Sequence, residues 1–520
     1  ADRARRHRAV AEWIDGLGRP EDHAEMLAYH WSSALELVRA SGGTDNELVD
    51  QTRLALRAAG DRAFALNSFV VAAAQYEEAL ELWPADRERP QLLFRRARAL
   101  YHAYDEERRE AALEEARDAL LAAGEADHAA EAESFLTQVS WYRGDGETTR
   151  VRLHRAEALC EGSISASAAR VLAVSARIRF IADEPEEAGR LAESALAMAD
   201  ELGLDELRAH ALTTIGMTKN DSGDLSGVAD MERALELALE IGSPIAATIV
   251  NNLAVEAFTV GDIRRARKLY EDSVQLAERL GDRESARFTG TNLIFADFFL
   301  GDWDSAARAL DDFIAACEAG AAHANEPDMR GLRGTLRRAR GDVAGARLDH
   351  ARAVELARVD GGSSSVIAAL IGSAAMHAEQ GELDAARALV AEALPIMRKT
   401  SQMGPLLQLV GHVERLGVRS SLLEVVRASQ LRRAVFWRDA AIVAMEGELI
   451  AAADFVSQTG AVTIESQLRF RGGQQLIAAG RHAEGKPELE RALAFYRSVE
   501  ASAYVAQIES ALAGAQSESA

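Results

Sequence analysis

Cysteine, proline and aromatic residues are scarce in this 520-residue chain, and each shortage excludes a class of protein. Two cysteines, Cys160 and Cys317, cannot build a disulfide framework, which suggests a reducing compartment. Nine prolines over this length leave little room for an all-β protein dense in turns. The longest apolar run, around residues 366–376, is too short to span a bilayer. We therefore expect a cytoplasmic location and no membrane contact.

Positive charge is also in short supply, because 59 basic residues face 82 acidic ones and the formal net charge is −23. A field of that sign repels phosphate backbones and anionic lipids, so we expect no direct nucleic-acid or membrane binding. The chain begins at Ala1 with neither an initiator Met nor a signal-peptide core. We therefore expect it to be a piece of a longer polypeptide.

A glycine followed by an acidic residue recurs through the middle of the chain. The glycines lie 38, 40, 40 and 40 residues apart in the five clearest copies, which are Gly223-Asp224, Gly261-Asp262, Gly301-Asp302, Gly341-Asp342 and Gly381-Glu382. Apolar residues after Gly261 step by three or four, as on one face of an α-helix, and the segments before the glycines also have a helical pattern. Each unit is thus predicted to be a helix, a tight turn at glycine, and a second helix that the acidic residue caps.

A single helical hairpin cannot bury its own apolar stripe, so the units are expected to stack into a superhelix. We predict an all-α fold, a right-handed α-solenoid of helical hairpins with a period near 40 residues, over residues 44–400. The glycine-acid signal fails around residues 400–420, so residues 401–513 are predicted to form an irregular unit followed by further repeats. Residues 1–43 are expected to be a helical junction and residues 514–520 a frayed tail.

The units resemble tetratricopeptide repeats, and the resemblance covers about residues 45–512. The family pattern is clearest at Gly60, Phe69, Ala72, Tyr76, Ala79, Leu80 and Pro84. Gly216 and Gly334 fall at the position of Gly60 relative to their own turns. The resemblance implies a concave surface that binds a protein partner or a small effector. Units near 40 residues exceed the usual 34, so longer helices are expected.

A second resemblance lies at the head of the chain. Residues 6–14 and 20–31 are similar to a junction in large bacterial signalling proteins, between a regulatory nucleotide-binding ATPase module of the STAND type and a C-terminal tetratricopeptide arm. Such parents commonly carry a class III adenylate or guanylate cyclase domain, or a helix-turn-helix DNA-binding domain. The resemblance therefore implies an upstream ATPase module of the same polypeptide as a partner.

Motifs for chemistry are weak. Residues 480–486 fit the first seven positions of a phosphate-binding loop, but Pro487 stands where Ser or Thr must ligate Mg²⁺, so we interpret the segment as a turn between helices. Cys160 and Cys317 occupy an apolar slot of the repeat. His23 and His30 are seven residues apart, or ~10 Å along a helix, too far to share one metal ion. We expect no catalytic residue, no cofactor and no metal site in this chain.

Two asparagines are candidates for ligand binding. Asn252 and Asn292 each lie nine residues before their turn glycine. In tetratricopeptide domains the corresponding positions face the concave surface, and some hold an Asn that bonds a peptide backbone. The cations of the carboxylate-binding version are absent, since the matching slots hold Asp328 and Leu332. The alternative is that both asparagines only cap helices or face solvent.

A basic stripe and an aromatic cluster complete the candidates. Arg330, Arg333, Arg337 and Arg340 recur at intervals of 3, 4 and 3 on one predicted helix. They predict either ion pairs with acids of the next helix or a docking site for an acidic or phosphate-bearing partner. Phe295, Phe298, Phe299 and Trp303 are at least partly core, while Phe295 or Phe299 could line the concave groove as an apolar anchor.

We predict a protein- or ligand-binding sensor or scaffold arm that regulates a signal-transduction ATPase and has no catalysis of its own. One alternative is a part of an adenylate or guanylate cyclase whose catalytic domain lies outside this chain. Another is the arm of a transcriptional regulator.

Overall fold

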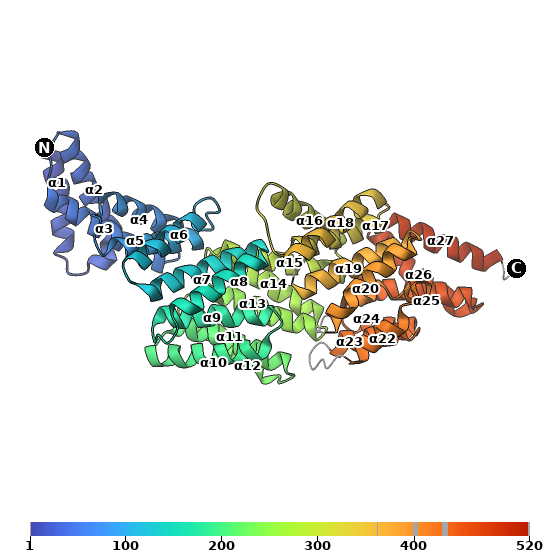
Figure 1. The fold of residues 1–520 in the computed structure, drawn as a ribbon. Helices are drawn as coiled ribbons and strands as arrows, with labels where there is room; N and C mark the ends of the chain where they lie inside the picture. The colour runs from blue at the N-terminus through green and yellow to red at the C-terminus, as the bar shows by residue number, and fades with distance from the viewer. Residues whose placement is uncertain (1, 361, 399–403, 429–434, 518–520) are drawn as a thin grey trace.

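The computed structural model describes residues 2–360, 362–398, 404–428 and 435–517. In these ranges the chain forms α-helices and two short 3-10 helices, with no strand (Figure 1). Most helices pack as antiparallel pairs with short turns, and the pairs stack side by side along the chain. The predicted all-α solenoid of tetratricopeptide-like hairpins is confirmed.

The helices follow one another without long loops. The first third contains α1 (Asp2–Asp15), η1 (Pro20–His23), α2 (Ala24–Ala40), α3 (Asn46–Ala65), α4 (Phe69–Leu82), α5 (Arg89–His102), α6 (Arg109–Ala122), α7 (Ala126–Arg143), α8 (Gly146–Leu159) and α9 (Ala166–Ile181). The middle contains α10 (Pro185–Leu202), α11 (Asp205–Asp221), α12 (Ser226–Glu240), α13 (Ile245–Thr259), α14 (Ile263–Arg279), α15 (Arg283–Leu300), α16 (Trp303–Glu318), α17 (Glu326–Ala339) and α18 (Val343–Asp360). The last part contains α19 (Ser363–Glu379), α20 (Leu383–Met397), η2 (Gly404–Gln408), α21 (Val413–Leu416), α22 (Arg419–Ala428), α23 (Val435–Met445), α24 (Leu449–Ser457), α25 (Val462–Ala478), α26 (His482–Ser498) and α27 (Ser502–Ser517).

The turn between paired helices has the predicted chemistry. Gly261 ends α13 in the left-handed region at φ +88°, which an L side chain rarely adopts. The side chain of Asp262 accepts a hydrogen bond from the backbone N–H of Arg265 and so caps α14. Asp302 caps α16 in the same way through Ser305. The prediction of glycine as the helix stop and aspartate as the next helix cap is confirmed at these turns.

The glycine of the first helix serves close packing. A Cβ placed on Gly334 of α17 would lie 2.8 Å from Cδ2 of His350 on α18, and 3.2 Å from the carbonyl oxygen of Ala346. The ring of His350 is fully buried. A side chain at residue 334 would therefore push the two helices of this hairpin apart.

Successive turns of the superhelix touch one another. The amide of Asn67 donates to the carbonyl of Gly242 at 3.1 Å, across 175 residues. The indole N–H of Trp437 donates to the carbonyl of Phe258 at 3.2 Å, across 179 residues. At the far end, Ser502 donates to the carbonyl of Arg340 across 162 residues. With units near 40 residues, one superhelical turn takes roughly four hairpins.

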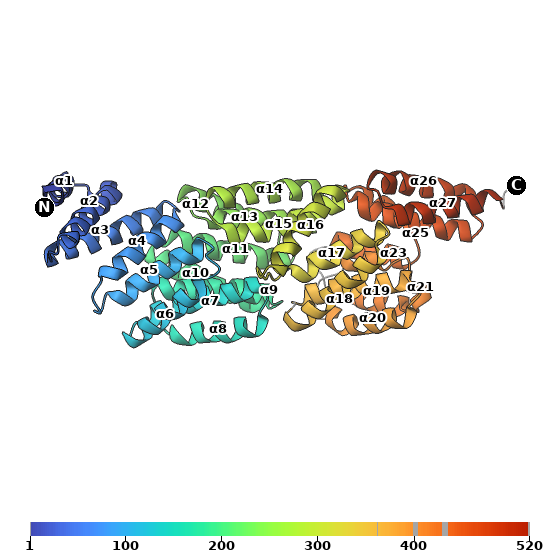
Figure 2. The same ribbon diagram turned by 90° about the horizontal axis from the view of Figure 1, so that it is seen from above.

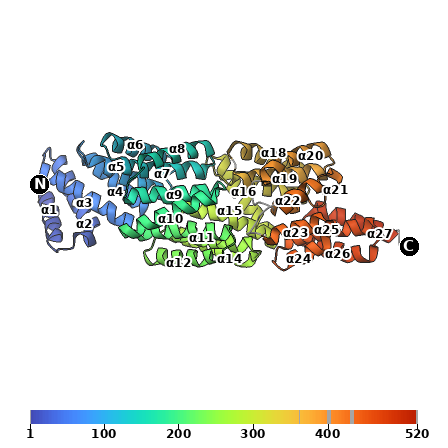
Figure 3. The ribbon, with the colours of Figure 1, turned by 60° about the horizontal axis from the view of Figure 1, so that its bottom comes forward.

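The resulting body is elongated, with the two termini at opposite ends (Figure 1). Seen from above, α12 and α14 run along the side opposite α6 and α8, and the chain between them winds around the long axis (Figure 2). A third view shows the same alternation at the C-terminal end, where α18 and α20 lie opposite α24 and α26 (Figure 3). The helices that come first in each pair thus surround a common interior.

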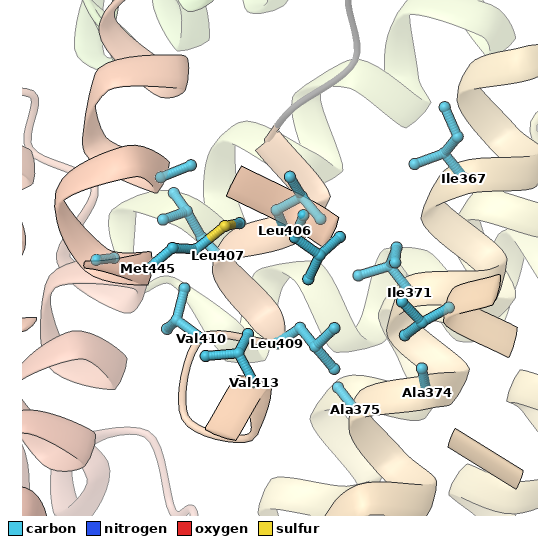
Figure 4. Close-up of a cluster of buried hydrophobic side chains, with 14 of the residues drawn as sticks. Ile367, Ile371, Ala374, Ala375, Leu406, Leu407, Leu409, Val410, Val413 and Met445 are labelled. Atoms are coloured by element: carbon cyan, nitrogen blue, oxygen red, sulfur yellow. The ribbon is translucent and has the colours of Figure 1, made fainter. Parts of the chain in front are cut away.

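The segment after α20 breaks the regular pairing. Here η2 and α21 span only five and four residues, and residues 401–403 and 429–434 lie outside the described ranges. Leu406, Leu407 and Leu409 are nevertheless fully buried. Leu406 and Leu409 lie toward Ile371 and Ala375 of α19, and Leu407 lies on the side of Met445 (Figure 4). Apolar contact with α19 therefore holds η2 against the interior of the superhelix.

The described residues at both ends of the chain are helical. Ala24 and Ala28 of α2 belong to the same apolar cluster as Leu56 and Tyr76, so the N-terminal helices pack directly on the first repeat. At the other end α27 continues to Ser517, three residues beyond Gly514, and residues 518–520 lie outside the described ranges.

The motifs that sequence analysis set aside lie in helices and turns. Gly480 lies in the turn between α25 and α26, at φ +76°, and no strand precedes it in the described chain. Cys160 and Cys317 are both buried and free. His30 contacts His7 of α1 through their Nδ1 atoms at 3.0 Å.

Candidate ligand-binding cavity

The interior of the superhelix encloses a cavity of about 820 Å³. Its walls come mainly from the first helices of successive hairpins, α7, α9, α11, α13, α15, α17 and α19. A few residues of α8, α10 and α14 also contribute, and η2, α23 and α25 complete the wall. A volume of this size is in the range of ligand-binding pockets.

The lining repeats with the sequence period. One row along the wall is formed by Asn252 on α13, Asn292 on α15 and Leu332 on α17. Further rows with the same 40-residue spacing are Ser285, Asn325 and Ser365; Thr248, Phe288, Asp328 and Ala368; and Val255, Phe295 and Thr335. Each hairpin therefore contributes equivalent positions to one continuous surface.

The two predicted asparagines both line the cavity and belong to an amide network. Asn292 donates from Nδ2 to Oδ1 of Asn251 at 2.9 Å. Asn251 in turn donates to Oδ1 of Asn252 at 3.3 Å. Asn325, the residue before α17, donates to the hydroxyl of Thr291 at 2.7 Å. Neighbouring helices thus orient these amides at the cavity wall, and ligand binding by Asn252 and Asn292 stays a prediction.

The aromatic cluster divides between core and cavity. Phe298 and Trp303 stack on each other at 5.6 Å between ring centroids and are buried, although Phe298 also reaches the cavity lining. Phe295 and Phe299 line the cavity as well, and their role as apolar anchors stays a prediction. Phe299 lies edge-on to Trp437 at 5.8 Å between ring centroids. Sequence analysis missed Trp437, because the contact joins segments 138 residues apart whose pairing no local pattern indicates.

Carboxylates outnumber arginines in the cavity wall. The acidic lining residues are Asp183, Asp221, Glu256 and Asp328, and the basic ones are Arg177 and Arg338. Arg177 stacks over Trp141 and donates to the hydroxyl of Tyr142 at 3.1 Å. Nε of Arg338 lies 3.3 Å from a carboxylate oxygen of Glu379. Arg177 therefore has its partner in the wall, and Arg338 has its partner just outside the lining.

Asp328 is the carboxylate with the least compensation. It accepts a hydrogen bond from the hydroxyl of Ser365 in the first turn of α19. Burial raises the pKa of Asp328 to about 6, and the Ser365 bond opposes this only in part. Within the described part of the chain, no lysine or arginine forms an ion pair with it.

The arginine stripe lies away from the cavity. Arg333 forms two hydrogen bonds with Asp349 of α18, at 2.7 and 2.9 Å, and Arg337 forms a third at 2.8 Å. The side chain of Asp349 is 2% exposed. Arg330 pairs with Glu326 at 2.7 Å and with Glu318 at 3.0 Å. The pairs with Asp349 are of the kind expected with acids of the next helix, whereas Arg330 pairs within its own helix and with the preceding one. Docking of an acidic partner on the stripe stays a prediction.

The described residues contain neither a metal-binding cluster nor a membrane-spanning helix. No group of three or more His, Cys, Asp or Glu side chains in these ranges is arranged to hold a metal ion. No described helix is long and apolar enough to cross a membrane.

Comparisons with known proteins show a similar fold and do not assign a function. No family model and no curated protein sequence matches the chain. Among solved structures, a Rap protein complexed with Competence and Sporulation Factor aligns with a TM-score of 0.50 at 14% identity, over 67% of this chain and 98% of that protein. The Cut9–Hcn1 hetero-tetramer of APC/C aligns with a TM-score of 0.49 at 13% identity, over 98% of this chain and 87% of that one. The quorum sensor NprR of B. thuringiensis, in its apo form, aligns with a TM-score of 0.39 at 10% identity, over 70% and 97%. These neighbours are helical repeat proteins like this chain.

Proposed function

We propose that this chain is a sensor arm whose ligand, an extended peptide or a peptide segment of a protein partner, occupies the cavity inside the superhelix. The observation that carries the proposal is the row of oriented amides along the cavity wall, with Asn252 and Asn292 at equivalent positions of neighbouring hairpins. A peptide backbone offers a donor and an acceptor at every residue, so regularly spaced amides suit it.

The apolar part of the lining supports the same ligand class. Phe295 and Phe299 flank the amide row on the side toward the turn, and each can pack against a side chain of a peptide. The solved Rap structure, which holds Competence and Sporulation Factor, has a similar fold and so is consistent with a bound factor in a solenoid of this kind.

The cavity also suggests how binding is transmitted. Its walls come from two successive superhelical turns, which meet through bonds such as that between the backbone N–H of Ala324 and the carbonyl of Tyr142 at 2.7 Å. A ligand that contacts both turns favours one pitch of the superhelix in proportion to its differential affinity for the two states. We propose that this change of pitch regulates an ATPase module joined to residues 1–43, which act as a helical junction.

A thermal-shift screen against pools of random pentapeptides tests the proposal. At a ligand concentration 100 times Kd, binding adds ~2.7 kcal/mol of stability, which a melting curve resolves. Asn292→Leu, which keeps the volume and removes the amide, should abolish or strongly reduce the shift. Gln275→Leu on the exposed face of α14 is the matched control and should retain it. Absence of any shift with the wild-type chain would refute the proposal.

A further inference from the structure

The charge inside the cavity indicates the kind of peptide. Four carboxylates and two arginines line it, and one of these arginines, Arg338, already pairs with Glu379, which is not a lining residue. Negative charge therefore exceeds positive charge at the wall, and it acts in a space with little water to screen it. An anionic ligand would meet repulsion there, and a neutral one would leave Asp328 without a countercharge.

Asp328 and Asp183 both contact serines in the first turn of α19. Ser365 bonds Asp328, and Ser363 contacts the carboxylate of Asp183, which follows α9. The start of a helix carries partial positive charge and its serine hydroxyls donate, so α19 offers both acids some relief. That relief is incomplete, because burial still raises the pKa of both carboxyls.

The position of Asp328 in the repeat is equally informative. Its equivalents on the two preceding first helices are Thr248 and Phe288, so the acid replaces an uncharged residue of the same row. Phe288 and its neighbour Trp141, 5.5 Å away between ring centroids, add aromatic surface to this part of the wall. A carboxylate beside aromatic rings is a suitable environment for an organic cation.

We propose that Asp328 recognises a positively charged nitrogen of the bound peptide, the ammonium or guanidinium of a basic side chain or the α-ammonium of its first residue. The proposal rests on the proposed function and specifies its ligand. Asp183, which contacts Ser363 in the same turn of α19, adds to the negative field that selects the cation.

Charge-sorted pentapeptide pools test this. Three pools carry an acetylated N-terminus with Lys, Gln or Glu fixed at the central position, and a fourth has a free N-terminus with Gln at that position. We expect the acetylated Lys pool, the free-amino pool, or both to bind roughly ten- to hundredfold more tightly than the acetylated Gln pool, the range expected for hydrogen bonds to charged groups. The Glu pool should bind most weakly. Which cationic pool binds identifies the source of the positive nitrogen.

Asp328→Asn keeps the shape and a hydrogen bond to Ser365 and removes the charge. It should remove the preference for cationic pools and leave weak binding of the Gln pool. Asp384→Asn, at a fully exposed carboxylate on α20, is the matched control and should keep the preference. Equal binding of all pools by the wild-type chain, or an unchanged preference in Asp328→Asn, would overturn the cation inference and leave the peptide proposal standing. No binding of any pool would overturn both.

Discussion

Arg109 of α6 forms a buried ion pair with Glu284 at the start of α15, although 175 residues separate them. The side chain of Arg109 is 1% exposed, and the side chain of Glu284 is 10% exposed. Beside them, Arg287 donates to the hydroxyl of Tyr104 at 3.0 Å. These contacts join the first superhelical turn to the second, near the wall of the cavity.

Loss of one partner of this pair should weaken the structure strongly. Arg109→Met leaves the Glu284 carboxylate buried without its cation, which typically costs about 3–5 kcal/mol. Urea unfolding followed by circular dichroism should show a lower midpoint for Arg109→Met, and Glu284→Leu in the same chain should restore part of the loss. The neighbouring Arg108 is more than half exposed, so Arg108→Met should cost less than about 1 kcal/mol. Equal midpoints for the two arginine variants would contradict the inter-turn pair.

The charge of Asp328 should cost stability in the absence of ligand. The folded-state pKa of about 6 lies above the unfolded value of 3.8, so the folded chain holds this proton more tightly. Stability from this group is therefore lost as the pH rises from about 4 to 6, by at most about 3 kcal/mol. Asp328→Asn should raise the melting temperature at pH 8 and leave it nearly unchanged at pH 4. A lower melting temperature at pH 8 would show that the charge has a structural role.

Two glycines of α17 allow a matched test of helix packing. Gly334→Ala places a Cβ against the buried ring of His350, so a loss of about 1–3 kcal/mol is expected from overpacking. At Gly331, one turn earlier, a Cβ meets nothing within 4 Å, so Gly331→Ala should be neutral or stabilising by up to about 1 kcal/mol. The urea-unfolding midpoints of the two variants measure this difference in stability. If Gly334→Ala were as stable as Gly331→Ala, α17 and α18 would not be in close contact.

Reversal of charge in the arginine stripe should lower the stability of the fold, whether or not a partner binds there. Arg333→Glu with Arg337→Glu would place two carboxylates against buried Asp349 and should cost about 3 kcal/mol or more. The control is Arg352→Glu, because the side chain of Arg352 is exposed and its ion pair in the described chain is with exposed Glu355 of its own helix. A double variant with wild-type stability would instead leave the stripe available to an acidic partner.

Local periodicity was sufficient to predict the hairpins. Gly261 and Asp262 identify a helix stop and the next helix cap, and the 40-residue register from Asn252 to Asn292 predicts that both lie on one surface. The stripe of Arg333 and Arg337 was correctly placed on one helix face, but spacing alone does not say which neighbour that face meets. Here it meets Asp349 of the paired helix.

The enclosure of the cavity could not be predicted in the same way. It depends on the pitch of the superhelix, which is the sum of small rotations between many units. Trp437 and Gln408 join the wall from segments more than 100 residues beyond Phe299, and η2, which carries Gln408, follows the point where the repeat signal fails. The excess of carboxylates over arginines in the wall likewise depends on which side chains the superhelix brings to the cavity.

Hydrogen–deuterium exchange of the chain with and without the tightest-binding pentapeptide pool tests the central claim most directly. If the ligand lies inside the superhelix, exchange should slow in the first turn of α19, in η2 and in residues 324–335, all of which line the cavity. Protection confined to outward helices such as α14 and α20, with these three segments unchanged, would contradict it.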